Sequence, residues 1–359
     1  MAYRHPGTIH YDNLPEPTGG TFNAQAFARG HRRWAFVPPA AGDPAQTGTI
    51  DDAAVLTHIG NIEWLDEIEY GNLDLENPYL ANLADGVTAV LDGESLSNVA
   101  TYQSSMAEMV DLIDKVRDEY PQIKWSFYSI PNVRFFIANN TWHGLETQGD
   151  TATIEARLDA YLAAYGPLMD AQDYVSPQIL DRYVAPERDQ QSRRFVHYSM
   201  EACNRWMADR GRTVDIVANG GIQYQYTDNF DGYIPTFIPT QELADEQIKP
   251  TLDNGGRTLL LWTGLTSFVP WAFDLSTFPL DHTQAGDAQA QLRAYRVNRY
   301  RLAFTADFFD GVAPDWNSAD DQETLRRALC EKMLETMDAM QSTVRLYGAA
   351  KASTLTALA

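Results

Sequence analysis

The chain has 359 residues, of which 44% are hydrophobic and 11% aromatic, enough to fill a large globular core. Its 49 acidic residues outnumber its 27 basic residues and give a formal net charge of −22. This charge repels phosphate backbones and anionic lipid surfaces, so we expect neither nucleic acid nor membrane as a partner. With no long apolar segment, the protein is expected to be soluble; a secreted protein whose leader has been removed is an alternative.

Residues 1–30 are rich in Pro, Gly, Asn and Thr without a regular period, so we expect an irregular N-terminal arm. From residue 31 to residue 346 short apolar runs alternate with helical patterns, and residues 347–359 are expected to form a tail. Seven runs are typical of buried strands: Trp34–Val37, Val87–Leu91, Ile123–Ile130, Tyr174–Leu180, Val214–Ala218, Tyr233–Ile238 and Thr258–Trp262. An eighth, short strand is expected between residues 41 and 75, where GNLDLENPY is the one weakly strand-like piece.

Helical patterns separate these runs. In Val99–Tyr120 the apolar residues recur at steps of three and four, which predicts a helix with one buried face. The other predicted helices are Asp51–Ile68, Thr151–Met169, Gln190–Arg210, Thr240–Asn254, Ala288–Phe304 and Asp321–Leu346. Strands separated by helices form parallel sheets, and this many units predict an α/β fold with a single-domain (β/α)8 TIM barrel over residues 31–346. A doubly wound open sheet is the alternative, although no G-x-G-x-x-G turn follows the first strand.

The stretch GVTAVLDGESLS ends an apolar run in two acids, Asp92 and Glu94, on either side of Gly93. If Val87–Leu91 is a strand, both carboxylates point to one face at its C-terminal end, where the catalytic loops of a barrel gather. Two such acids in a partly desolvated site would not both ionise, so one would hold a proton. We therefore predict Glu94 as proton donor and Asp92 as its partner; capping of the next helix is the alternative.

Other predicted strand ends carry aromatic and amide side chains that suit a carbohydrate, because sugar rings stack on aromatic faces and sugar hydroxyls need polar partners. The predicted substrate contacts are Trp34, Trp125, Gln178, Tyr183 and Trp262. We expect Tyr128 and Asp181 to act in catalysis. A conventional mechanism requires a second carboxylate across the cleft from Glu94, for which Asp181 is the first choice. The other candidates for it are Asp228, Asp231 and Glu242.

The D-x-E pattern of residues 92–94 resembles that of glycoside hydrolase barrels, among them chitinase-like and hyaluronidase-like enzymes. The likeness to hyaluronidases covers TIDDAAVLTHIGNIEWLDEI and GVTAVLDGES, where a helix with an L-x-x-H-L-like stretch precedes the strand. It implies that Glu94 protonates the glycosidic oxygen, that Asp92 orients an N-acetyl group of the substrate, and that Tyr128 hydrogen-bonds this group. The sequence departs from these patterns, since residues 87–91 are uncharged and no tryptophan separates the two acids.

No H-E-x-x-H, P-loop or G-x-S-x-G motif occurs, so we expect neither a metal nor another cofactor. Cys203 and Cys330 lie in predicted helices and are expected to be buried thiols. The sequence therefore predicts a glycoside hydrolase that cleaves a poly- or oligosaccharide. A non-catalytic carbohydrate-binding or structural barrel is the alternative, and a lyase or aldolase is a lesser one, since Lys124 lies at the start of its predicted strand. The sugar, the linkage and the oligomeric state stay open.

Overall fold

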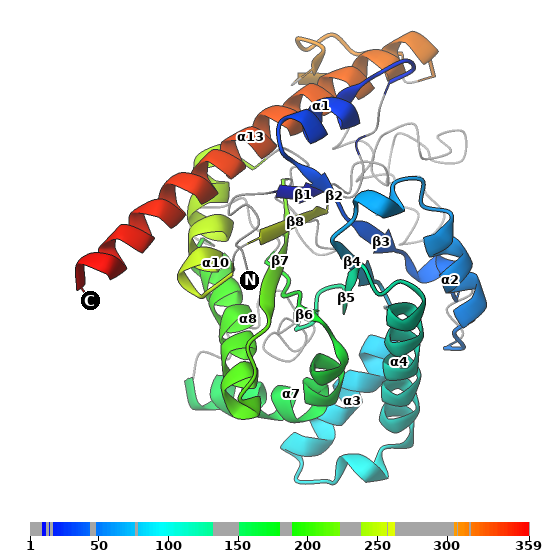
Figure 1. The fold of residues 1–359 in the computed structure, drawn as a ribbon, viewed down its shortest axis with the longest axis vertical. Coiled ribbons are helices and arrows are strands. Elements are labelled where there is room, and N and C mark those ends of the chain that lie inside the picture. Colours follow the sequence, from blue (N-terminus) through cyan, green and yellow to red (C-terminus); the bar gives the residue numbers. More distant parts are fainter. Residues whose placement is uncertain are drawn as a thin grey trace.

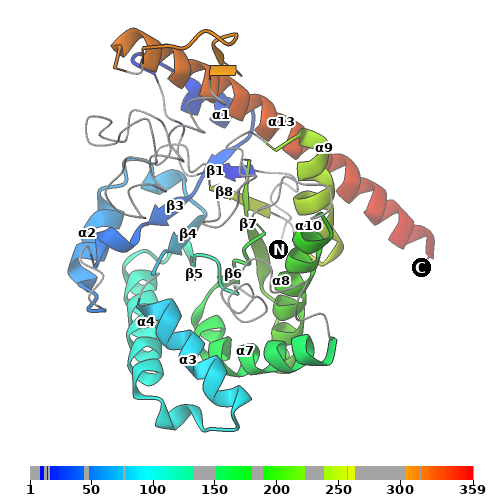
Figure 2. The ribbon, with the colours of Figure 1, turned by 180° about the vertical axis from the view of Figure 1, so that it is seen from behind.

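A ring of parallel strands lies at the centre of the molecule, and helices surround it (Figure 1, Figure 2). The protein is thus an α/β barrel, as the sequence predicts. The computed structural model describes residues 9–11, 14, 17–43, 48–75, 78–131, 151–179, 189–222, 238–256, 258–262, 305–306, 308–315 and 317–358.

The described strands all pair in parallel. They are β1 (Ile9–Tyr11), β2 (Arg32–Arg33), β3 (Ala35–Val37), β4 (Tyr70–Leu73), β5 (Lys124–Phe127), β6 (Tyr174–Val175), β7 (Asp215–Gly221) and β8 (Thr258–Trp262). Backbone hydrogen bonds give the order β2-β1-β8-β7-β6 in one sheet and β3-β4-β5 in the other. Parallel pairing fits strands that are buried on both faces.

Two connections join these sheets into a closed ring. β2 and β3 belong to one segment that is interrupted only at Trp34, whose N–H donates to the carbonyl oxygen of Tyr11 at 3.1 Å. Between β5 and β6, Asp173 N–H donates to the Trp125 carbonyl and Ser176 N–H to the Ile130 carbonyl, each at 2.9 Å. The two accepting carbonyls, of Trp125 and Ile130, are five residues apart, whereas the two donating amides, of Asp173 and Ser176, are three residues apart. The chain after β5 therefore contains extra residues that bulge out of the ladder.

The closed ring has seven strand positions among the described residues, counting β2 and β3 as one, whereas the sequence predicted eight. Hydrogen bonds connect each described position to the next, so this ring leaves no free edge for an eighth strand. The weakly predicted strand in GNLDLENPY is confirmed as β4. The expected irregular arm is wrong for Ile9–Tyr11, which pairs with both β2 and β8 as β1, and for Phe22–Ala28, which form a helix. The predicted strand Tyr233–Ile238 lies outside the described residues except for Ile238.

Most of the predicted helices are confirmed. The α-helices are α1 (Phe22–Ala28), α2 (Asp52–Gly60), α3 (Tyr79–Leu91), α4 (Ala100–Glu119), α7 (Thr151–Ala171), α8 (Asp189–Arg210), α9 (Thr240–Glu242), α10 (Lys249–Asp253) and α13 (Ala319–Leu358). A π-helical turn, η5 (Leu243–Ile248), joins α9 to α10, and the 3-10 turns are η1 (Pro39–Ala41), η2 (Leu65–Glu67) and η3 (Leu96–Asn98). The expected tail is helical up to Leu358 as part of α13, and the predicted helix Ala288–Phe304 lies outside the described residues.

The predicted strand Val87–Leu91 is wrong, because these residues form the end of helix α3. The buried residues of α3 include Tyr79, Leu83, Gly86 and Val87, which recur at steps of three and four. Gly86 lies against Tyr102 of α4, and a Cβ atom at Gly86 would be only 2.4 Å from the Tyr102 ring. The apolar run is therefore one face of an amphipathic helix that packs on α4.

Replacing Gly86 with Ala should lower the stability by about 1–3 kcal/mol, because the Tyr102 ring must move to admit the methyl group. The higher helix propensity of Ala favours the variant by about 1 kcal/mol, and the steric cost at Tyr102 outweighs this gain. Gly348 of α13 is the matched control, since no atom lies within 4 Å of its would-be Cβ, and Gly348→Ala should stabilise the protein. Thermal unfolding followed by circular dichroism measures both; a similar stabilisation in the two variants would contradict the close packing.

Candidate functional site

The interior of the barrel contains a compact cluster of inward-facing apolar side chains. Its buried members are Trp34, Tyr70, Tyr174, Val217 and Leu260. Phe36 and Tyr128 pack against this cluster and are only half-buried. Since Phe36 lies near the end of β3 and Tyr128 directly follows β5, these two rings lie toward the C-terminal end of the barrel.

A fully buried group of amide and hydroxyl side chains joins three strand positions across this interior. Asn72 Nδ2 donates to Ser176 Oγ at 3.1 Å and to Asn219 Oδ1 at 3.2 Å. Asn219 Nδ2 donates to Ser176 Oγ at 2.7 Å, and the Tyr174 hydroxyl donates to Asn72 Oδ1. Burial raises the pKa of Tyr174 well above its ordinary value, so its hydroxyl stays protonated and can donate. We call Asn72, Tyr174, Ser176 and Asn219 the amide network.

Asp74 lies just beyond the amide network, at the C-terminal end of β4. Its N–H donates to the Val37 carbonyl at 2.9 Å, and the neighbouring Tyr128 N–H donates to the Leu73 carbonyl at 2.9 Å, so the ladder continues past the end of the strand. Side chains alternate along an extended chain, and Asn72 faces the interior, so Asp74 belongs to the interior side as well. Asp74 is 8% exposed. A nearly buried carboxylate therefore lies at the mouth of the barrel.

Two aromatic rings flank this mouth. Phe36 and Tyr128 meet edge to face, with 5.5 Å between ring centroids and 81° between ring planes, and Phe36 also meets Trp34 at 5.6 Å. Sugar rings bind to exposed aromatic surface of this kind through their apolar C–H faces. Sequence reasoning missed Phe36 and chose its neighbour Trp34, because alternation alone did not tell which of the two rings would remain accessible.

The sequence continues from Asp74 through Leu75 to Glu76, so a D-x-E pattern directly follows β4. Glu76 itself lies outside the described residues. The sequence predicts a short strand in this stretch, but the predicted site residues do not include the two acids that follow it. A D-x-E pattern after a short strand was the available signal.

The predicted catalytic pair Asp92 and Glu94 is wrong in its placement. Both side chains are exposed and lie just after helix α3, not at the end of a strand. Gly93 has a φ of +77°, and Glu94 N–H donates to the Ala89 carbonyl at 2.8 Å, which is the Schellman ending of a helix. A glycine that follows a run of helical period is the signal that would have indicated a helix end here.

The other predicted residues divide between the barrel mouth and the packed core. Tyr128 and the buried Gln178 follow β5 and β6, and Gln178 bridges to Asn219. Trp262 ends β8 opposite Gly221, and its side chain lies outside the described atoms. These three residues therefore occupy C-terminal strand ends, as predicted.

Trp34 and Trp125 do not line the mouth. Trp34 is 1% exposed inside the barrel, and its Nε1 donates to the Leu261 carbonyl at 3.4 Å. Trp125 is fully buried in the larger core between the strands and the helices, on the outer side of the ring. Both are core residues, which corrects their prediction as substrate contacts. Asp181 and Tyr183 lie outside the described residues.

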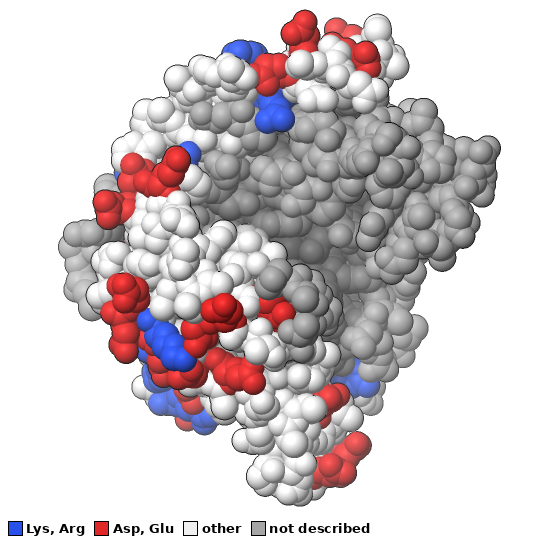
Figure 3. All heavy atoms as spheres, turned by 90° about the vertical axis from the view of Figure 1, so that its right-hand side faces the viewer, with Lys and Arg blue, Asp and Glu red and all other residues white. Residues whose placement is uncertain are grey.

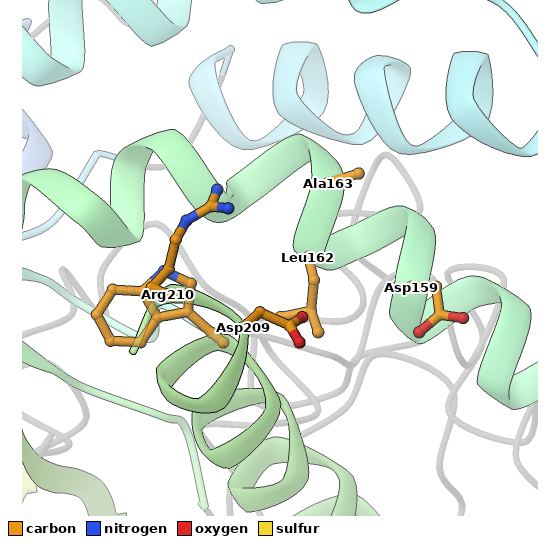
Figure 4. Close-up of a pocket in the computed structure, with 6 residues that line it drawn as sticks. Asp159, Leu162, Ala163, Asp209 and Arg210 are labelled. Carbon is orange, nitrogen blue, oxygen red and sulfur yellow. The ribbon is translucent and has the colours of Figure 1, made fainter. Parts of the chain in front are cut away.

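A shallow cavity of about 310 Å³ lies away from the strand ends, between α7 and α8 (Figure 4). Its lining residues are Asp159, Leu162, Ala163, Trp206, Asp209 and Arg210. Arg210 Nε donates to the Asp170 carboxylate at 3.1 Å, and Trp206 Nε1 donates to the same carboxylate at 3.0 Å. These contacts join the two helices, so the polar groups of the cavity wall serve helix packing.

The buried thiols are confirmed, since Cys203 and Cys330 are both buried and do not form a disulfide. Within the described part of the chain, no three His, Cys, Asp or Glu side chains are grouped closely enough to hold a metal ion. None of the helices in that part is both long and apolar enough to cross a membrane.

Comparison with known proteins gives structural matches only. No protein-family model matches the chain, and no curated protein matches it. The crystal structure of bee venom hyaluronidase matches with a TM-score of 0.48 and 12% identity, over 81% of this chain and 99% of that chain. Bee venom hyaluronidase in complex with a hyaluronic acid tetramer matches with a TM-score of 0.45 and 13% identity, over 73% and 92%. Hyaluronidases are among the enzymes that the sequence resembles.

His10 of β1 is a buried titratable group of the barrel. It is 2% exposed, its ring meets Tyr70 edge to face at 5.2 Å, and its Nδ1 has no hydrogen-bond partner among the described atoms. Burial lowers the pKa of His10 to about 4, so its imidazole is neutral in the folded protein near pH 7.

The unfolding free energy should therefore decrease as the pH falls from about 6.5 toward 4, because only the unfolded chain binds a proton at His10 in this window. Protonation of His10 in the unfolded chain alone lowers the unfolding free energy by about 3 kcal/mol in total over this pH range. In the variant His10→Gln the unfolding free energy should fall less between pH 7 and pH 4.5 than in the wild type, whether or not the substitution changes the stability at pH 7. Urea unfolding at pH 7 and pH 4.5 measures the difference, with the exposed His197→Gln as control. An unchanged pH dependence in His10→Gln would contradict a neutral buried imidazole.

Proposed function

We propose that the chain is a glycoside hydrolase whose active D-x-E pair is Asp74 and Glu76. One observation carries the proposal: the nearly buried Asp74 carboxylate at the C-terminal end of β4, beside the half-buried rings of Phe36 and Tyr128. In barrels of parallel strands the catalytic residues come from this end. An acidic side chain held at this end of a barrel lies where catalytic groups act, so its position favours a role in chemistry.

Glu76 is the proposed general acid that protonates the glycosidic oxygen, and Asp74 is its partner. Two carboxylates two positions apart in a partly desolvated site ionise one at a time, so one of them can hold the proton that the leaving group needs. If the substrate carries an N-acetyl group, Asp74 orients this group for attack on the anomeric carbon. If it does not, a second carboxylate across the cleft is needed, and Asp181 is the candidate.

The substrate would bind along the mouth of the barrel. Phe36 and Tyr128 offer an apolar edge to one sugar ring, and the Tyr128 hydroxyl can donate to a ring substituent. Gln178 and Trp262, at the ends of β6 and β8, are the proposed polar and aromatic contacts on the other side. This combination of stacking surface and hydrogen-bonding groups suits an oligosaccharide.

Glu76→Gln and Asp74→Asn should each lower kcat by about 10²-fold or more, since each removes a group that acts on the reacting bond. The chain supplies a matched control, because Asp92→Asn and Glu94→Gln make the same changes in an exposed D-x-E pattern. The control variants should keep wild-type activity. Release of reducing ends from a panel of neutral, acidic and N-acetylated glycans measures turnover, and circular dichroism checks the fold.

The opposite ranking, with Glu94→Gln inactive and Glu76→Gln active, would contradict the proposed pair. Glycan binding without turnover, equal in wild type and in Asp74→Asn/Glu76→Gln, would instead identify a carbohydrate-binding barrel. Loss of activity together with loss of the circular dichroism signal would assign Asp74 to folding, and Glu76→Gln would then decide the catalytic role.

Phe36→Ala should raise KM about tenfold and change kcat less, because the ring contributes stacking surface worth about 1.4 kcal/mol and no reacting group. Phe27→Ala is the matched control: this ring is 47% exposed on α1 and lies under the Arg32 guanidinium. Steady-state kinetics with the best glycan of the panel measures both variants. Equal KM values for Phe36→Ala and wild type would exclude Phe36 from the substrate site.

A further inference from the structure

The basic side chains nearest the strands lie at the end of the barrel opposite to Asp74. Lys124 is the first residue of β5, and its Nζ is 2.7 Å from Asp215 Oδ2 at the start of β7 and 3.8 Å from Glu69 Oε1, just before β4. The same ammonium group lies 5.1 Å from the Tyr70 ring centroid. This cation is bound to acids at the N-terminal end and is not available to a substrate at the mouth.

Two arginines near the same end are also paired with acids. Arg117 Nε lies 3.1 Å from Asp173 Oδ1, in the residues that lead into β6. Arg212 precedes β7, lies 3.9 Å from Asp170 Oδ1 and donates to the Asp170 carbonyl at 2.8 Å. These three cations are thus paired with acids on the far side of the barrel from the mouth, whereas Arg32 and Arg33 of β2 stack on the rings of Phe27 and Trp64.

The mouth itself has acidic charge. In the described residues that connect strands β1 to β7 to the helices that follow them, the charged side chains are Asp43, Asp51 and Asp74. Asp43 is 5% exposed and accepts from the Gly48 N–H at 2.7 Å, and Asp51 caps helix α2. None of these described connections offers a lysine or arginine to a bound anion.

The sequence of the other segments that follow these strands has no excess of positive charge. Segments 132–150, 180–188, 223–237 and 263–304 follow β5, β6, β7 and β8 in the sequence and carry nine acidic and seven basic residues. The chain as a whole has a net charge of −22, and acidic side chains are widespread on the described surface in Figure 3. A polymer of uronic acids would meet repulsion on approach, and the described connections after β1 to β7 hold no lysine or arginine to pair with its carboxylates.

From this charge distribution, we infer that the substrate is an uncharged glycan, either a neutral or an N-acetylated oligosaccharide, and not a uronic acid polymer. The inference rests on the proposed hydrolase function. Carboxylates on a substrate are recognised by arginine and lysine, whereas sugar hydroxyls and amides are satisfied by neutral groups. The half-buried Tyr128 hydroxyl and the Phe36 ring at the mouth suit the second kind of substrate.

Matched substrate pairs that differ only in charge test the inference. Hyaluronan oligosaccharides are compared with the same oligosaccharides after methyl esterification of their carboxylates, and oligoglucuronates with cello-oligosaccharides. We expect kcat/KM to be at least about tenfold higher for the neutral member at 20 mM NaCl. The ratio should shrink at 500 mM NaCl, because salt screens the repulsion of the charged member.

Two results would overturn the inference: equal or faster cleavage of the charged member, or a rate on it that falls as salt is added. Either one would still support the hydrolase function, because turnover itself is observed. If neither pair is cleaved, the hydrolase proposal fails for these backbones, and calorimetric binding of the same pairs to the full chain decides the charge preference separately. Tighter binding of the neutral member supports the inference, and equal or tighter binding of the charged member overturns it.

Discussion

The amide network inside the barrel is the constraint on which the site depends. Asn72, Ser176, Asn219 and Tyr174 are fully buried, so each polar atom that lacked a partner would cost about 1–3 kcal/mol. The partners come from β4, β6 and β7, so these side chains can all form their hydrogen bonds only when the three strands hold fixed positions relative to one another. Hydrogen bonds in such a dry interior also strengthen one another. The strand ends above the network are thereby held in one arrangement.

This rigidity explains how a short strand can support a carboxylate at an opening. β4 has four residues, yet it pairs with β3 and β5 and is fastened to β6 and β7 through Asn72. Asp74 comes two residues after Asn72, so the hydrogen bonds of Asn72 also fix the position of the Asp74 backbone. Asp74 is 8% exposed, and reduced hydration strengthens the electrostatic interactions of a carboxylate in such a place.

The sequence predicted those features that depend on local periodicity. The helix Val99–Tyr120 is α4 almost to the residue, because its apolar residues repeat with a helical period over five turns. Val87–Leu91 is too short for its pattern to distinguish a strand from a helix. Because the run was predicted as a strand, Asp92 and Glu94 were predicted to lie at a strand end and so in the site. β1 has only three residues, and its place depends on pairing with β8 some 250 residues away, which no local pattern reveals. The charge separation between the two barrel ends depends on the same long-range arrangement.

The odd number of strand positions among the described residues has a geometric consequence for the closing of the ring. In a barrel with an even number, the side chains that point inward at a given height can alternate from strand to strand around the whole circle. With seven positions this alternation cannot close, so one pair of neighbours must be out of step. The bulge between β5 and β6 is where the register slips, from Trp125–Asp173 to Ile130–Ser176. Tyr128 itself stays in step with β4, since its N–H donates to the Leu73 carbonyl at 2.9 Å, so the slip falls on the side of β5 that faces β6 and leaves the ladder beside Asp74 regular.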